Sequence, residues 1–353
     1  MTSAEQERLR IGMLGPIAWR TPPRHYGPWE QVVSTLTEGL VAAGHDVTLY
    51  ATGDSSTTAR LRSVVAHGYE DNDGYDDSYD VAVFKALHIA ACFEDAAAGE
   101  FDVVHSHLDF MPLTWSRLVD VPVVTTIHGF SSEAIVPAYR RYDGHVHYVA
   151  ISDADRHPDL TYAATIHHGV EPSRFPFRRD PDPDGHVVFF GRIHPDKGTH
   201  LAIDIARAAR RSIMVAGIVH DDVYFRREVE PRIGEGVEYL GPVGGERRAA
   251  VLGAATALLH PIAFEEPFGL SVAESMLCGT PVIAFSRGSM PEIVDDGVSG
   301  FLVDDVGGAV AALGRIGQIN RSRCHAEAVR RFGVERMVAE YVDVYRAVLR
   351  AVN

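Results

Sequence analysis

The sequence is poor in features that would each indicate a particular class of protein. It has only three cysteines, Cys92, Cys278 and Cys324, which lie too far apart in the chain for a metal-ligand spacing. We predict reduced, mostly buried thiols in a cytoplasmic protein. No apolar run approaches the roughly 20 residues that a transmembrane helix needs, and the polar first residues do not resemble a secretory signal. Peripheral attachment to a membrane through an amphipathic surface stays open.

Positive charge is also scarce. Lys and Arg total 33 against 48 Asp and Glu, which gives a formal net charge of −15 at pH 7. Because a protein that binds nucleic acid needs a basic surface, no nucleic-acid partner is expected. A local basic pocket for a small anionic ligand remains compatible with this balance. Hydrophobic residues make up 46% and charged residues 23%, as in an ordinary globular protein.

Short apolar runs, which we interpret as buried strands, alternate with amphipathic segments. In the first half they are Arg10–Leu14, Asp46–Ala51, Asp102–His105, Pro122–Ile127 and His147–Ile151. In the second half they are His186–Phe190, Ser212–Ala216, Val237–Leu240, Ala257–His260, Pro281–Ala284 and Gly300–Val303. Helical periodicity lies between them, for example over Glu30–Ala43. The alternation predicts an α/β protein with parallel sheets covered on both faces.

Length and composition divide the chain in two. A length of 353 residues exceeds one typical core, and Glu171–Gly185 carries four prolines and no periodicity. We predict a first domain over residues 1–172 and a second over 173–333. Val334–Arg350 has helical spacing, and residues 334–353 are expected to pack back on the first domain. The acidic stretch Glu70–Asp80 is predicted to be a solvated loop, with an acceptor-facing role as the alternative.

Two glutamates in the second half are candidates for chemistry. Glu266 and Glu274 are separated by seven residues, and the chain between them changes from a turn to a helix over Leu270–Leu277. The unpaired N–H groups at that helix start favour a phosphate. Glu266 would precede the helix, whereas Glu274 would lie about one turn inside it and could accept hydrogen bonds from a ribose diol. The alternative is a pair of exposed surface carboxylates.

Two cations follow the predicted strand His186–Phe190, in the sequence GRIHPDKG. Arg192 and Lys197 would therefore lie at the C-terminal end of a strand, where open α/β sheets bind ligands. A planar guanidinium and an ammonium together suit a diphosphate. Neither GxxxxGK[ST] nor GxGxxG follows any strand. The alternative is a solvated basic loop.

The segment EPFGLSVAESMLCGTPVIAFSRGSMPEIVDDGVSG, Glu266–Gly300, resembles the signature of the retaining GT-B glycosyltransferases. That family includes sucrose-phosphate synthases and bacterial phosphatidylinositol mannosyltransferases. The resemblance covers nearly the whole chain, through PPRHYGPWE, GHDVTLY, FDVVHSH, TTIHG and GRIHPDKG. It implies two Rossmann-like domains facing across a cleft, with the acceptor on the first and a nucleotide-sugar donor on the second. It implies no cofactor and no metal.

The resemblance also implies a role for individual residues. Glu266 matches the acid that contacts the donor sugar, and Glu274 matches the acid that binds the ribose. Arg192 and Lys197 match the pair that neutralises the donor diphosphate, and His128 matches a histidine that contacts the transferred sugar. The predicted catalytic residues are therefore His128, Glu266, Arg192 and Lys197. The predicted substrate-binding residues are Gly27, His107, Gly269, Leu270, Ser271 and Glu274.

The chain departs from the family in the loop after the first strand. That loop commonly has two adjacent glycines, but here Gly27 is followed by Pro28 and Trp29. Gly27 still lets the backbone approach a phosphate closely, whereas Pro28 removes an N–H donor and fixes φ. We therefore expect a stiffer loop. Trp29 is interpreted as a packing residue, with a platform for a sugar ring as the alternative.

Histidine occurs 18 times, so accidental clusters are expected. His105 and His107 should lie on one face of a strand. His107 is predicted to line the acceptor side of the cleft, with a structural role as the alternative. No carboxylate or cysteine at a suitable spacing supports zinc at the other close histidines, which are His145/His147 and His167/His168.

The sequence thus predicts a metal-independent retaining hexosyltransferase. It would move a hexose from a UDP- or GDP-linked donor to a hydroxyl of a small molecule or glycan, by front-side attack. The alternatives are a nucleotide-sugar-binding protein without transferase activity, and a phosphorylase or epimerase of the same fold. Lys197→Ala is expected to weaken diphosphate binding and to leave the fold intact. The donor base, the sugar and the acceptor stay open.

Overall fold

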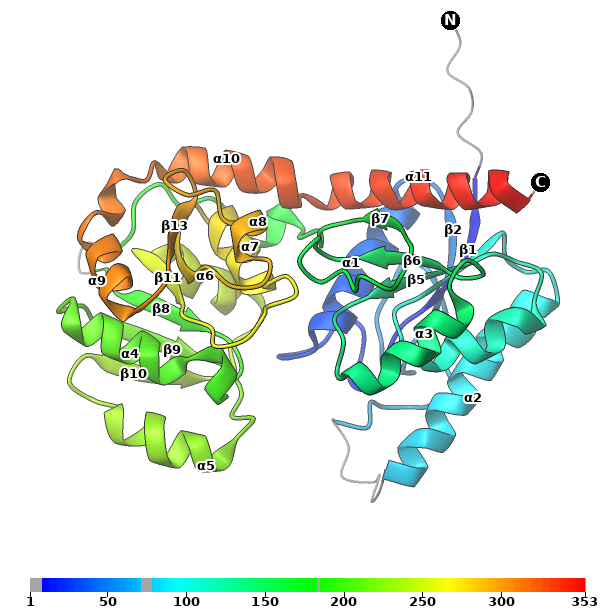
Figure 1. Cartoon of the computed structure of the whole chain (residues 1–353), viewed down its shortest axis with the longest axis horizontal. Helices are drawn as coiled ribbons and strands as arrows, with labels where there is room; N and C mark the ends of the chain where they lie inside the picture. The colour runs from blue at the N-terminus through cyan, green and yellow to red at the C-terminus, as the bar shows by residue number, and fades with distance from the viewer. Residues whose placement is uncertain (1–7, 71–77, 183–184, 353) are drawn as a thin grey trace, which may run out of the picture. The chain divides into compact units, whose positions relative to one another are not determined.

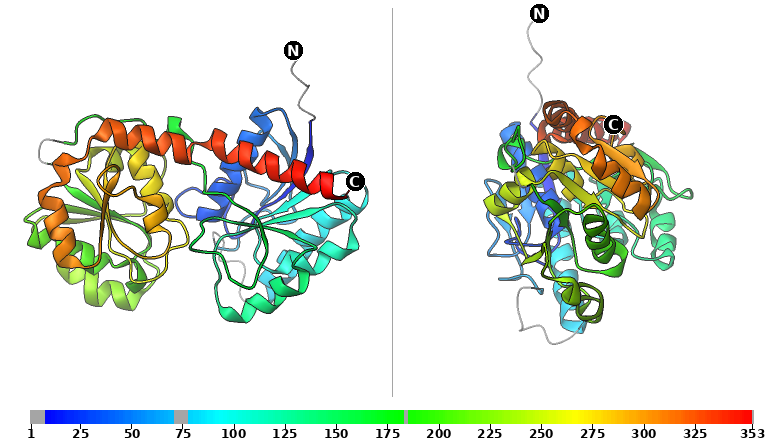
Figure 2. Two further views of the ribbon diagram at one scale, coloured as in Figure 1. Left: turned by 45° about the horizontal axis from the view of Figure 1, so that its top comes forward. Right: turned by 90° about the vertical axis from the view of Figure 1, so that its left-hand side faces the viewer.

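The computed structural model describes residues 8–70, 78–182 and 185–352, which form two compact units. Unit 1 contains the chain up to Ile151, then Arg156–Gly169 and the segment from Val334 onward. Unit 2 contains Ser152–Asp155 and Val170–Gly333. Each unit is built on its own parallel sheet with helices on both faces, as Figures 1 and 2 show. The predicted α/β architecture with two Rossmann-like sheets is confirmed.

The sheet of unit 1 has seven strands in the order β3-β2-β1-β4-β5-β6-β7. They are β1 Arg10–Leu14, β2 Asp46–Tyr50, β3 Arg60–Arg62, β4 Val103–Ser106, β5 Val123–Ile127, β6 His147–Ala150 and β7 Tyr162–Thr165. The predicted strands agree with these bounds to within a residue. Strands β3 and β7 were not predicted, because these edge strands are exposed or half-buried and contain no continuous apolar run.

Helices cover both faces of this sheet. One face carries α1 (Pro28–Ala42) and α11 (Val334–Val352). The other carries α2 (Ser78–Ala97), the 3-10 helix η1 (Met111–Leu118) and α3 (Val136–Tyr142). Helix α1 begins two residues before its predicted start, because proline at the first helical position needs no partner for an N–H. Of the predicted acidic loop, residues 71–77 lie outside the described residues, and its last three residues begin α2.

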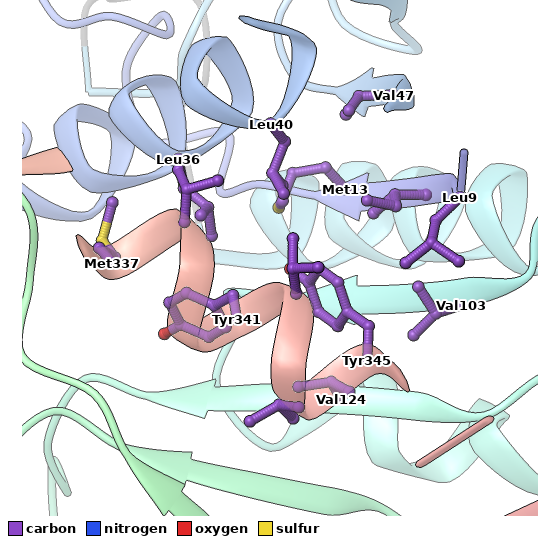
Figure 3. Close-up of a cluster of buried hydrophobic side chains, with 14 of the residues drawn as sticks. Leu9, Met13, Leu36, Leu40, Val47, Val103, Val124, Met337, Tyr341 and Tyr345 are labelled. Carbon is purple, nitrogen blue, oxygen red and sulfur yellow. The ribbon is translucent and has the colours of Figure 1, made fainter. Parts of the chain in front are cut away.

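Helix α11 completes the core of unit 1 (Figure 3). Met337, Tyr341 and Tyr345 recur every four residues along the helix, and all three are fully buried. They pack against Leu36 and Leu40 of α1 and against the strands beneath. The segment after Gly333 therefore belongs to the hydrophobic core of the unit that begins the chain.

The sheet of unit 2 has six strands in the order β10-β9-β8-β11-β12-β13. They are β8 Val187–Phe190, β9 Ile213–Ala216, β10 Val237–Gly241, β11 Ala257–His260, β12 Val282–Phe285 and β13 Gly300–Val303. The helices are α4 Thr199–Ala208, α5 Asp222–Tyr224, α6 Gly245–Ala254, α7 Leu270–Leu277, α8 Met290–Ile293, α9 Val306–Gly314 and α10 Arg321–Phe332. Right-handed crossovers lead in opposite directions from β8 and β11, so α4 and α7 cover opposite faces.

The predicted break Glu171–Gly185 is not a free linker. Its described residues belong to unit 2, where the N–H of Arg178 donates to the carbonyl of Cys278 at 3.0 Å. The chain instead leaves unit 1 after Gly169 and returns to it at Val334. In its described part, the segment contains only the short 3-10 helix Pro172–Arg174, and its contacts keep it on unit 2.

All three cysteines are buried free thiols, as expected. Burial raises the pKa of Cys278 and Cys324 to about 12, which suppresses thiolate reactivity near neutral pH. Among the helices of the described ranges, none combines the length and apolar composition needed to cross a bilayer.

Candidate active site

The strand order of unit 2 reverses at the boundary between β8 and β11. Strands β9 and β10 lie on one side of β8, whereas β11, β12 and β13 lie on the other. Loops on either side of such a reversal diverge and leave a ligand crevice at the C-terminal ends of the strands. Here the two loops are residues 191–198 and 261–269, which carry Arg192, Lys197 and Glu266. The topology therefore brings the predicted cations and the first predicted glutamate to one place.

Gly198 lets the two loops approach each other closely. Its φ is 69°, in the left-handed region that favours glycine. A Cβ at this position would lie 2.0 Å from the carbonyl oxygen of Pro261. Only glycine meets both conditions, and the contact places Lys197 beside Glu266, 69 residues further along the chain.

Lys197 and Glu266 form a buried ion pair. The ammonium donates to Oε2 of Glu266 and lies 4.5 Å from the ring centre of Phe264. Nε2 of His260 is 3.6 Å from the same oxygen. Burial alone raises the pKa of Glu266, but Lys197 and His260 outweigh it and lower that pKa to about 2. Glu266 is only 8% exposed, so it is a buried, ionised carboxylate rather than a surface charge.

The backbone beneath Glu266 is fixed by the turn after β12. The N–H of Ser289 donates to the carbonyl of Glu266 at 2.9 Å, and its Oγ donates to the carbonyl of Phe268 at 3.1 Å. Phe268 is fully buried and packs edge-on against Phe332. These contacts give the backbone that carries Glu266 a defined position.

Arg192 lies in the same loop as Lys197 and is half-buried. Its guanidinium makes no hydrogen bond or ion pair with any other residue that the structure describes. A planar cation whose donors are not engaged within the protein can receive an anionic ligand. The solvated-loop interpretation still fits Arg192, but the buried pairing of Lys197 excludes it for that residue.

Helix α7 begins at Leu270, as predicted. Gly269 precedes it with φ 85°, and no side chain caps the helix N-terminus. The first backbone N–H groups of the helix, at Leu270 and Ser271, belong to half-buried residues. An uncapped N-terminus carries unsatisfied donors and a partial positive charge, which favour an anion.

Glu274 lies about a turn inside α7 and is paired with Arg248 of α6. Glu274 is 5% exposed, and Nε of Arg248 donates to its Oε2 at 2.7 Å. Burial raises the pKa of Glu274, and the charge of Arg248 offsets this only in part. Arg248 was not predicted, because nothing in the pattern of α6 distinguishes it from its exposed neighbour Arg247.

The other predicted side chains meet in unit 1, at the ends of β4 and β5. Nδ1 of His107 and Nε2 of His128 share a hydrogen bond of 2.9 Å. Nδ1 of His128 shares a longer one, 3.3 Å, with Nε2 of His168. Trp29 stacks on the His128 ring with centroids 5.1 Å apart, which agrees with its interpretation as a packing residue. Both nitrogens of His128 are thus engaged.

These histidines are neutral at physiological pH. Burial lowers the pKa of His128 and of the neighbouring His105 to about 3. It also holds the pKa of His107 and His168 well below the ordinary value. The rings of His105 and His107 lie 4.2 Å apart, on one face of the sheet as expected. His168 was missed as a partner of His128, because the sequence suggested only a zinc role for it.

Gly27 stands directly before α1, with φ 146° and ψ 72°. A Cβ at this position would lie 2.8 Å from Cβ of Pro23 and 2.9 Å from Oε2 of Glu30. Pro28 takes the first helical position. The loop therefore requires glycine and is fixed at its junction with the helix. The structure groups Gly27, His107 and His128 in unit 1 and all the other predicted site residues in unit 2.

Two protein families match this chain. Residues 29–181 match the family described as Glycosyltransferase Family 4, and residues 184–318 match Glycosyl transferases group 1. Together these segments cover most of both units. The second contains both loops at the strand reversal and helix α7.

Individual relatives agree with the family matches. The chain is 26% identical to the phosphatidyl-myo-inositol mannosyltransferase of Mycolicibacterium smegmatis, over 96% of this chain and 94% of that protein. Its fold is similar to that of sucrose-phosphate synthase from Thermosynechococcus elongatus, with a TM-score of 0.78, 18% identity and coverage of 98% and 100%. It is also similar to Anabaena HepE, solved in complex with UDP and glucose, with a TM-score of 0.72, 18% identity and coverage of 96% and 100%. The chain therefore belongs to the glycosyltransferases of the GT-B fold, and it is an enzyme of that class.

Proposed function

We propose that this glycosyltransferase is a retaining, metal-independent hexosyltransferase that uses a UDP- or GDP-linked donor and a hydroxyl acceptor. The observation that carries the proposal is the cluster at the ends of β8 and β11. There the loop that carries Arg192, the Lys197–Glu266 pair and the uncapped start of α7 gather within unit 2. Each of these groups suits one part of a nucleotide-sugar donor.

The cations and the helix start suit the diphosphate. Cleavage of the anomeric C–O bond builds negative charge on the leaving diphosphate, and fixed positive groups stabilise it. Arg192 has its donors available, whereas Lys197 is engaged with Glu266. An ammonium has three donors, so it can hold the carboxylate and a phosphate oxygen together. These groups would supply the charge that a metal ion supplies elsewhere.

Glu266 suits the sugar rather than the acceptor proton. With a pKa lowered to about 2, it is ionised and cannot act as a general acid near neutral pH. It can accept hydrogen bonds from sugar hydroxyls and stabilise positive charge that develops on the sugar ring. In the proposed front-side attack, an oxygen of the leaving phosphate takes the proton of the acceptor hydroxyl. The new glycosidic bond then forms on the face that the diphosphate leaves.

His128 is the proposed sugar contact in unit 1, where the acceptor also binds. Both of its nitrogens are engaged, so a sugar hydroxyl would replace the longer bond, the one to His168. The short bond to His107 would then keep the ring oriented. A hexose donor is supported by two similar proteins, one named a mannosyltransferase and the other solved with UDP and glucose. A cytoplasmic location is supported by the three free buried cysteines.

Thermal unfolding with UDP, GDP, ADP and their sugar conjugates, with and without EDTA, tests the donor site. A ligand at 100 times its Kd stabilises the folded protein by about 2.7 kcal/mol, which raises the Tm by several degrees. We expect one nucleotide to stabilise the chain selectively and EDTA to have no effect. The absence of any shift at millimolar ligand would refute the proposal.

The alternatives need turnover measurements with the donor so identified. Breakdown of a glycoside by free phosphate would identify a phosphorylase. Interconversion of sugar nucleotides without an acceptor would identify an epimerase, and binding without turnover would identify a binding protein. For a transferase, the anomeric proton coupling in the NMR spectrum of the product decides between retention and inversion.

A further inference from the structure

Arg248 uses only one of the two oxygens of Glu274. Its Nε donates to Oε2 at 2.7 Å, and its Nη2 donates to the same atom. Among the described residues, none donates a hydrogen bond to Oε1. This atom is not fully shielded from solvent, so a ligand can still reach it. The carboxylate is therefore divided into one oxygen held by a cation and one oxygen that can still accept a hydrogen bond.

This geometry differs from that of a pair optimised for stability alone. A guanidinium and a carboxylate bind most strongly when two parallel N–H donors meet both oxygens. Here Arg248 does not bind the second oxygen. Glu274 is nearly inaccessible to solvent, so pairing of both oxygens would stabilise its carboxylate further. The pair is thus arranged to orient the carboxylate, with one acceptor left over.

Arg248 is itself held in place by Phe190. The guanidinium carbon lies 4.3 Å from the centre of the phenyl ring, within the range of a cation–π contact. Phe190 is the last residue of β8 and directly precedes the loop that carries Arg192 and Lys197. The position of Arg248 is therefore fixed against the same strand that positions the diphosphate cations.

We propose that Arg248 is a positioning residue of the donor site, which holds Oε2 of Glu274 and thereby turns Oε1 toward a ribose hydroxyl of the nucleotide. The inference rests on the proposed function, because it takes a nucleotide as the ligand of unit 2. It adds Arg248 to the donor site, as the residue that orients the carboxylate of Glu274. Through that carboxylate, Arg248 would make the site prefer ribose to deoxyribose.

The charged groups around Glu274 explain why one arginine decides its state. Arg248 faces it from α6, Arg174 acts from the segment before β8 through a weaker interaction, and Cys278 directly follows the last residue of α7. Burial favours the protonated form, and Arg248 is the main opposing charge. Without Arg248, Glu274 should take up a proton more readily. A neutral carboxyl accepts a weaker hydrogen bond than a carboxylate.

The test measures the affinity of the full chain for UDP, GDP and their 2′-deoxy analogues by calorimetry at pH 6 and pH 8. We expect the wild type to prefer the ribonucleotide roughly tenfold, as a charge-assisted hydrogen bond allows. In Arg248→Met this preference should fall to about twofold, and ribonucleotide affinity should rise with pH as Glu274 ionises. Arg248→Lys should recover part of the preference for the ribonucleotide. Both hydrogen bonds of Arg248 end on Oε2 of Glu274, so a single ammonium can replace them in part.

Arg247→Met is the matched control, since Arg247 is an exposed neighbour on the same helix. It should behave as the wild type. If Arg248→Met does not fold, Arg248→Gln keeps a hydrogen-bond donor without the charge and should show the same loss and the same pH dependence. A variant at Arg248 that keeps the full preference at both pH values would overturn the inference and leave the proposed function standing. A wild type that binds none of the nucleotides would overturn both.

Discussion

Replacing Lys197 with methionine should destabilise unit 2 as well as weaken donor binding. The sequence alone predicted that loss of this lysine leaves the fold intact. The structure adds a cost in stability to that expectation, because Lys197 is the cation that compensates the buried carboxylate of Glu266. Methionine has a similar length and no charge, so the substitution removes the pair without opening a large cavity.

The size of the effect follows from the pKa of Glu266. Its pKa is lowered from an ordinary 4.5 to about 2. Since each pKa unit corresponds to about 1.4 kcal/mol, the ionised Glu266 contributes about 3 kcal/mol net to stability after its burial is counted, and Lys197 is the largest favourable cause. The two side chains are only 15% and 10% exposed, so solvent screening reduces this little. For a domain of this size, a loss of about 3 kcal/mol lowers the Tm by roughly 6–12 °C.

The pH dependence gives the sharper test. A depressed carboxyl pKa stabilises the fold above about pH 4.5, and this contribution is lost as the pH falls toward 2. In the variant, Glu266 has no ammonium beside it and takes up a proton at higher pH. The difference in unfolding free energy between wild type and Lys197→Met should therefore be largest at pH 7 and should shrink toward pH 4. A difference that stays constant over this range would refute the reasoning.

The assay must report on unit 2. All three tryptophans are in unit 1, so their fluorescence follows the other unit; they are Trp19, Trp29 and Trp115. Calorimetry or far-UV circular dichroism is suitable instead. The double variant Lys197→Met/Glu266→Gln serves as the control. It should recover most of the lost stability, because removing one partner of a buried pair costs more than replacing both by neutral groups.

Three further predictions concern single positions. Gly198→Ala should abolish nucleotide binding and lower the Tm, because a Cβ would lie 2.0 Å from a carbonyl oxygen. The control is Gly245→Ala, which is also at positive φ but has open space around it. It should lower the free energy of unfolding in urea by only about 1–2 kcal/mol. Trp29→Ala should destabilise unit 1 by about 1 kcal/mol more than Trp29→Phe, which keeps a ring over His128, and equal urea midpoints would contradict this. Unit 1 should lose stability below about pH 6.5, because a buried histidine such as His128, whose pKa in the folded protein is about 3, gains its proton only on unfolding. Each such histidine should lower the free energy of unfolding by up to about 1.4 kcal/mol per pH unit. His128→Gln should reduce that pH dependence in urea titrations followed by tryptophan fluorescence, and an unchanged slope would show that this histidine is not buried in its neutral form.

Local patterns predicted the elements that carry most of the site. The change from a turn to a helix after Gly269 predicted helix α7 with its observed bounds, and the strands before both ligand loops were predicted to within a residue. Edge strands were missed where burial is incomplete, as at β3 and β7. A short strand that is mostly exposed leaves no periodic signal in the sequence.

The pairings within the site could not be predicted in the same way. Lys197 and Glu266 were both selected from their local motifs, but their contact depends on β8 and β11 being neighbours in the sheet. Strand order is not written in either motif. The pairing of Arg248 with Glu274 depends likewise on the packing of α6 against α7. Composition and periodicity show which face of a helix is buried. Which residue of another element contacts that face is known only from the three-dimensional structure.

Because unit 2 is inserted into unit 1, the two units face different conditions during synthesis. The nascent chain delivers Val170–Gly333 as an almost continuous stretch, so unit 2 can fold as it leaves the ribosome. Unit 1 must wait for Val334–Val352, since that helix fills part of its core. Until then, the apolar surface beneath α11, which includes Leu36 and Leu40, lies uncovered.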